Sequence, residues 1–132
     1  MSEMPKEKDA PGKARYTVQF DEKLQIIRQE IEGELTEEDA RAISAASSAL
    51  VDASKDPGKV RILIKHANFI RTPSKARKIF MNDLKRSNLY RIAVVGQSPG
   101  IKAMLFFLSL ATGLNKMKMF SNEREAVRWL FE

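Results

Sequence analysis

The spacing of hydrophobic residues predicts two strands at the start of the chain. Apolar and polar residues alternate over 15–20, as in a strand with one buried face. After a short polar turn at 21–23, a second strand is predicted over 24–32 and ends at Gly33. The short turn indicates that the two strands pair as a hairpin.

A helix is predicted to follow. Thr36 is a suitable N-cap, and Asp39 stands three residues later in a capping-box position. Helical spacing continues to about Lys55, and the sequence at 56–58 (Asp-Pro-Gly) stops it. The predicted buried stripe is Ala40, Ile43, Ala46, Ser47, Leu50 and Ser54.

Strands and helices alternate through the rest of the chain. Strands are predicted over 60–64, 90–95 and 116–120. One helix begins near Pro73 and another spans about 99–112, and a final helix opens at 121–123. The predicted buried residues are Ala76, Ile79, Phe80 and Leu84 in the first of these helices, and Ala126, Val127, Trp129 and Leu130 in the last.

This order, ββαβαβαβα, predicts an α/β fold with a small mixed sheet. Its βαβ units require parallel strand pairs, with helices flanking the sheet. One domain is predicted over residues 15–132. Residues 1–14 are polar, contain two prolines and a glycine, and predict a flexible tail.

Composition excludes several kinds of site. The 132 residues include no cysteine and one histidine, so disulfides, a transition-metal site and a bound cofactor are not expected. The N-terminus lacks the apolar core of a signal peptide. The longest apolar run, 101–110, is interrupted by Lys102 and is too short for a transmembrane segment. A cytoplasmic protein is expected.

Residues 96–100 read Gly-Gln-Ser-Pro-Gly and match the G-x-S-x-G pattern of serine hydrolases. That chemistry needs the backbone N–H after the serine for the oxyanion hole, and Pro99 has none. The only histidine, His66, precedes Ser98 instead of following it. The sequence therefore predicts that Ser98 caps a helix and that the protein is not an enzyme.

Charge is concentrated in one segment. Residues 71–91 hold seven basic residues and one acidic residue, Asp83, which equals the net charge of +6 of the whole chain. Such a segment favours an anionic partner, although a solvated helix face is the simpler interpretation.

Four segments resemble the STAS superfamily, and most closely its SpoIIAA-like branch of small stand-alone proteins. They are the helix entry at 33–39 (GELTEED), the strands at 61–65 (RILIK) and 91–96 (RIAVVG), and the closing segment at 119–130. The resemblance covers about 15–132. It implies a non-catalytic domain that regulates by binding another molecule.

The resemblance also points to the start of the second helix. Anti-sigma-factor antagonists carry a phosphorylatable serine there, in an Asp-Ser-Ser/Thr-Gly pattern. Here residues 71–74 read Arg-Thr-Pro-Ser, with neither the aspartate nor the glycine. Thr72 and Ser74 are candidate phosphorylation sites, since Arg71 and Lys75 would favour the added charge. An N-cap role for Thr72 is the favoured alternative.

The sequence thus predicts a docking surface on the second helix for a protein partner or an anionic lipid. Nucleic acid is disfavoured, because no aromatic residues are interleaved with the lysines of this helix. The candidate residues for binding the partner or an anion are Arg71, Thr72, Ser74, Lys75, Lys78 and Lys85.

An alternative function follows from the helix predicted at 99–112, which is apolar on nearly every face. Internal packing would explain this, and so would a surface for an apolar ligand, a lipid or a second copy of the chain. The candidate residues are Met104, Phe106, Phe107 and Leu110. His66 is interpreted as a loop residue that caps the sheet edge, and not as a ligand.

Overall fold

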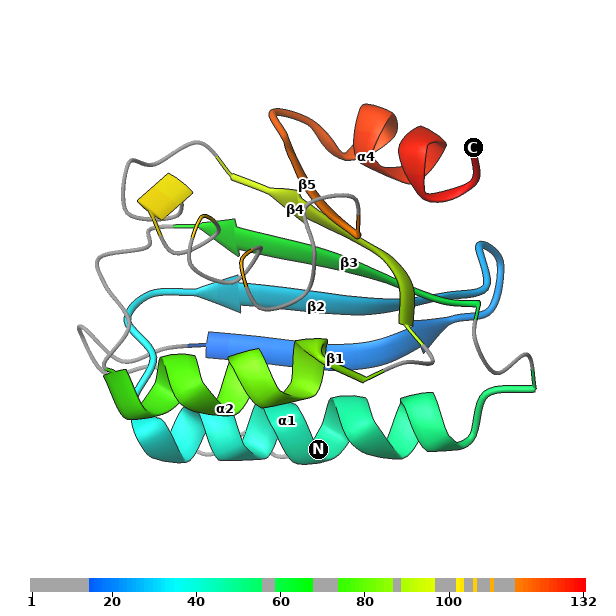
Figure 1. Cartoon of the computed structure of the whole chain (residues 1–132). Coiled ribbons are helices and arrows are strands. Elements are labelled where there is room, and N and C mark those ends of the chain that lie inside the picture. The colour runs from blue at the N-terminus through cyan, green and yellow to red at the C-terminus, as the bar shows by residue number, and fades with distance from the viewer. Residues whose placement is uncertain are drawn as a thin grey trace.

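The computed structural model describes residues 15–55, 59–67, 74–86, 89–96 and 116–132, together with Lys102, Ala103, Phe106 and Leu110. The helix predicted over 99–112 lies largely outside these residues, as does its predicted cap Ser98. The described elements follow the predicted order (Figure 1). They are β1 (Arg15–Asp21), β2 (Ile26–Glu32), α1 (Glu37–Asp52), β3 (Val60–Ala67), α2 (Ser74–Leu84), β4 (Leu89–Val95), β5 (Met117–Phe120) and α4 (Glu123–Leu130).

The five strands form one mixed sheet in the order β1-β2-β3-β4-β5. β1 and β2 pair antiparallel as the predicted hairpin, and the other neighbours pair parallel. The α/β fold predicted from the sequence is confirmed.

Helices cover both faces of the sheet. α1 and α2 pack on one face, where the core includes Ile62, Ile92 and Met117. α4 packs on the other face through Ala126 and Leu130. In Figure 1, α1 and α2 lie together along the lower edge of the view and α4 lies at the top.

The start of α1 confirms the predicted capping box. Thr36 Oγ1 accepts from the Asp39 N–H at 3.0 Å, and Asp39 Oδ2 accepts from the Thr36 N–H at 3.0 Å. The predicted stripe is wrong at Ala46, which is exposed. Its buried residues step from 43 to 47 and then to Val51, which the prediction omitted, because these positions stay on one face of a helix.

The hairpin turn is longer than predicted. Leu24 belongs to the turn, and the second strand begins at Ile26. Asp21 Oδ1 accepts from the Leu24 N–H at 3.0 Å, and Gln25 adopts a positive φ of 60°. The aspartate thus closes a turn over 22–25, which takes in Leu24 and Gln25 from the predicted strand.

A charged network fastens α4 to the sheet. Arg28 lies 2.9 Å from Glu123 and 3.1 Å from Asp21, and Lys65 lies 3.0 Å from Glu123. The Leu24 N–H, and then Arg28, hold the pKa of Asp21 below its ordinary value. Lys65, and then Arg28, lower the pKa of Glu123.

Acid is therefore expected to weaken the fold. A carboxyl whose folded-state pKa is lowered stabilises above its unfolded pKa of about 4, and the stabilisation is lost as the pH falls through the folded value. The melting temperature should therefore decrease as the pH is lowered from about 5. Arg28→Met should lower it at neutral pH and flatten the acid decrease, whereas Arg124→Met, at an exposed position, should do neither. Parallel acid profiles for the native chain and Arg28→Met would contradict this role.

Candidate functional site

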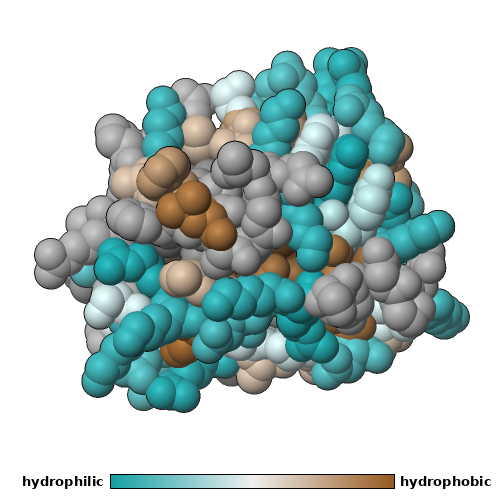
Figure 2. Space-filling model, viewed as in Figure 1, coloured by the Kyte–Doolittle hydropathy of each residue, from teal (hydrophilic) through white to brown (hydrophobic). Residues whose placement is uncertain are grey.

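The outward face of α2 carries the described part of the predicted docking surface. Ser74, Lys75 and Lys78 of α2 and Lys85, which directly follows its last residue, are all exposed. Figure 2 shows hydrophilic residues over much of the lower part of the molecule, where α2 and α1 lie. The predicted candidates Arg71 and Thr72 lie outside the described residues.

The single acid of α2 faces away from these lysines. Asp83 is half-buried against α1, where its Oδ1 accepts from Ser44 Oγ at 2.9 Å. Burial raises the pKa of this carboxyl above its ordinary value. In the sequence analysis, the negative charge of Asp83 was subtracted from the seven positive charges of this segment. Because Asp83 points inward, no acid of α2 lies among the three exposed lysines.

The basic segment does not form one surface. Arg86 pairs with Asp52 at the end of α1. Arg91 lies on the other face of the sheet, where its Nη1 donates to the Trp129 carbonyl at 2.5 Å. The described part of the docking surface is therefore the lysine face: Ser74, Lys75, Lys78 and Lys85.

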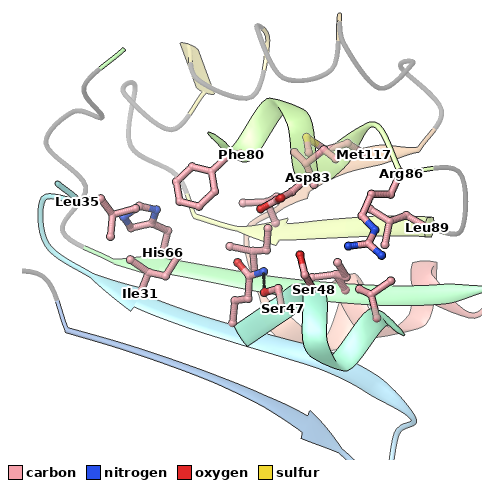
Figure 3. Close-up of a pocket in the computed structure, with 16 residues that line it drawn as sticks. Ile31, Leu35, Ser47, Ser48, His66, Phe80, Asp83, Arg86, Leu89 and Met117 are labelled. Carbon is pink, nitrogen blue, oxygen red and sulfur yellow. Dashed lines mark hydrogen bonds between the residues drawn. The ribbon is translucent and has the colours of Figure 1, made fainter. Parts of the chain in front are cut away.

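A cavity of about 50 Å³ lies beneath α2, between the sheet and the two helices. In Figure 3, His66 and Leu35 lie at one end and Arg86 and Leu89 at the other, with Phe80 between them. Most of the lining is apolar. A water molecule takes up about 30 Å³ in the liquid, so the cavity has room for water and is too small for a lipid chain.

Two polar residues of this cavity form a buried pair. Gln29 and Ser47 are both buried, and Gln29 Nε2 donates to Ser47 Oγ at 2.7 Å (Figure 3). The sequence predicted that Ser47 is buried, but it did not single out Gln29. Their pairing depends on the packing of α1 on β2, which no local pattern reveals.

His66 does not lie in a loop, contrary to the sequence interpretation. It belongs to β3 and is 5% exposed. Its Nε2 lies 3.3 Å from the Gly33 carbonyl. Burial lowers the pKa of the imidazole, against the opposing effect of that hydrogen bond, so the ring is neutral at pH 7. This arrangement joins the end of β2 to β3.

An open hollow of about 550 Å³ lies at the carboxyl ends of β2 and β3, a common ligand position in α/β sheets. Its walls include Glu30 and Lys65. Arg28 lies 3.6 Å from Glu30, and Glu123 lies 3.0 Å from Lys65. Glu30 and Lys65 are therefore part of the charged network that fastens α4 to the sheet.

Of the alternative apolar surface, the structure describes Phe106 and Leu110. Both are helical, and they are 61% and 64% exposed. Met104 and Phe107 lie outside the described residues. Phe106 and Leu110 are four residues apart, so they share one face of a helix.

The described part of the chain has neither a metal cluster nor a membrane-spanning helix. It contains no group of three or more His, Cys, Asp or Glu side chains that could hold a metal ion. None of its helices has the length and hydrophobicity needed to cross a membrane.

Comparison with known proteins identifies the fold. The sequence model of the SpoIIAA-like family matches residues 26–131 of this chain. An anti-sigma factor antagonist from Mycobacterium paratuberculosis superposes with a TM-score of 0.66 at 16% identity, over 93% of this chain and 98% of that one. An uncharacterized protein with a SpoIIAA-like fold from Shewanella loihica PV-4 gives 0.65 at 19% identity, over 89% and 93%. No curated protein matches the chain.

Proposed function

The chain belongs to the SpoIIAA-like family, and on that premise we propose that it is a non-catalytic regulatory domain that binds an acidic protein through the lysine face of α2. The inward orientation of Asp83 carries this proposal. Because Asp83 bonds to Ser44 of α1, the exposed charges described on α2 are all positive. The similar anti-sigma factor antagonist supports a protein as the partner.

The contribution of these ion pairs to the binding affinity can be stated as an expected magnitude. An exposed ion pair contributes about 0.2–1 kcal/mol, so three pairs would together account for about a tenfold change in affinity. The attraction must also weaken as salt rises, because the lysines are exposed to solvent. A partner held mainly by apolar contacts would show neither property.

The triple variant Lys75→Gln/Lys78→Gln/Lys85→Gln is expected to bind the partner about tenfold more weakly. Tagged native and variant chains are used to capture partners from the source cell extract at low and moderate salt. The dissociation constant of a captured protein is then measured by calorimetry.

The matched control is Lys23→Gln/Lys55→Gln/Lys59→Gln, which removes the same charge from exposed positions outside α2. It should bind like the native chain. Equal affinity for the α2 variant and the native chain, or equal loss in both triple variants, would overturn the proposal.

Phosphorylation at the start of α2 belongs to the same proposal. Ser74 is exposed at the first position of the helix, where a negative charge is favourable. A phosphate there would offset the charge of Lys75 and Lys78 and weaken binding of an acidic partner. Thr72 is proposed for the same role from the sequence.

A second candidate function is binding of an apolar ligand or a second copy of the chain. The exposure of Phe106 and Leu110 on one helical face favours it. Native mass spectrometry tests it. A bound apolar molecule or a dimer that is lost in Phe106→Ser/Leu110→Ser would support this function, and a bare monomer would contradict it.

A further inference from the structure

Cations and aromatic rings alternate across the face of the sheet that carries α4. Arg61 Cζ lies 4.5 Å from the Phe131 ring centroid and 4.9 Å from that of Tyr90. Arg91 Cζ lies 5.2 Å from the Tyr90 centroid and 4.7 Å from that of Trp129. We call this series the cation–aromatic ladder.

The ladder continues onto β5. The Trp129 and Phe120 centroids lie 5.6 Å apart, and Lys118 Nζ lies 5.5 Å from the Phe120 centroid. Phe131 is 46% exposed, Lys118 is exposed, and the other members are half-buried. In order, the members are Phe131, Arg61, Tyr90, Arg91, Trp129, Phe120 and Lys118.

Part of the ladder has a structural role. Arg61 Nε donates to the Leu130 carbonyl at 2.6 Å, and Arg91 Nη1 donates to the Trp129 carbonyl at 2.5 Å. These bonds satisfy the last carbonyls of α4 and place positive charge at the negative end of the helix. Among the described residues, neither arginine has a hydrogen-bond partner for its Nη2.

Helix capping does not give the ladder cations a carboxylate partner. Arg61 and Arg91 occupy paired positions on adjacent parallel strands, where like charges repel. Within the described ranges, none of the ion pairs involves Arg61, Arg91 or Lys118. A bound anion would relieve this repulsion.

We propose that the cation–aromatic ladder binds single-stranded nucleic acid. Such a strand presents phosphates and flat bases in alternation, which matches cations that alternate with rings. Arginines held against rings are oriented for phosphate. An acidic peptide would use the cations and leave the four rings without a role. The sequence disfavoured nucleic acid because α2 lacks interleaved aromatics, and folding brings them together from β3, β4, β5 and α4.

Trp129 is the only tryptophan of the chain, so its fluorescence reports on the ladder directly. Oligothymidylate of about 15 nucleotides is titrated into the full native chain at about 50 mM salt. Saturable quenching is expected. A single strand loses about 0.7 in log–log salt slope per neutralised phosphate, so three cations predict a slope of about 2. No saturable change up to about 100 µM would overturn the proposal.

Three comparisons separate stacking from charge alone. Polyphosphate and polyglutamate of similar length supply charge without bases and should bind about tenfold more weakly. Duplex DNA, whose bases are already stacked, should also bind more weakly. Equal affinity for any of these polymers would overturn the assignment to a single strand.

Variants locate the site without disturbing the arginines that cap α4. Phe131→Ala should weaken oligonucleotide binding about tenfold and Lys118→Gln about threefold. Arg41→Gln removes one charge from α1 on the opposite face and should change nothing. If the triple lysine variant of α2 abolishes binding while Phe131→Ala and Lys118→Gln do not, the ladder is not the site. That result would leave the proposed function of α2 standing.

Discussion

Leu130→Ala is expected to lower the free energy of unfolding by about 3 kcal/mol, the largest effect predicted here. Leu130 is fully buried and packs with Leu63, Ala93 and Ala126 between α4 and the sheet. Its truncation removes apolar contacts and leaves a cavity, since the neighbouring backbone is fixed by the sheet. Urea unfolding measures the change, and the melting temperature should fall by about 10 °C.

The same substitution at Leu110 provides the control. Its side chain is 64% exposed, so Leu110→Ala should change the free energy of unfolding by less than about 0.5 kcal/mol. Similar losses in both variants would mean that α4 does not pack as described.

Ser47→Ala is expected to cost about 2 kcal/mol, more than removal of a single hydroxyl normally costs at a surface. The substitution deprives the buried Gln29 amide of the Ser47 oxygen at 2.7 Å. A buried polar group without its hydrogen bond retains its full desolvation cost. The double variant Gln29→Met/Ser47→Ala should recover most of the loss, because it removes both polar groups.

Urea unfolding of the four members of this cycle measures the coupling. An energy of about 1 kcal/mol or more between the two positions is expected. Ser48→Ala is the control, because Ser48 also lines the cavity but is only half-buried. Additive losses from Gln29→Met and Ser47→Ala would show that the bond does not stabilise the fold.

The local signals in the sequence were strong enough to predict the fold. The capping box of Thr36 and Asp39 depends on residues three positions apart, and the apolar run of β3 is contiguous. The errors arose where a contact outside the local pattern set the backbone. The Asp21 carboxylate draws Leu24 into a turn, and pairing with Ile31 of β2 keeps His66 within β3.

The candidate surfaces depended on longer-range arrangements. Helical spacing predicted that the lysines of α2 face outward. The inward orientation of Asp83 could not be predicted in the same way, because it depends on a contact with Ser44 of α1. Arg91 counted toward the same basic segment, although it lies on the α4 side of the sheet. The ladder could not be predicted, because Arg61 and Phe131 meet only through the sheet and the docking of α4.

Site-specific crosslinking tests the central claim, docking through α2, most directly. The chain has no cysteine, so Asn82→Cys introduces one labelling position among the exposed lysines of α2. A benzophenone maleimide is attached there or, as a control, at Glu125→Cys on α4. Docking through α2 predicts crosslinks to an acidic protein from position 82 and none from position 125. Crosslinks from 125 alone, or none from 82 while the labelled chain still captures its partner, would contradict it.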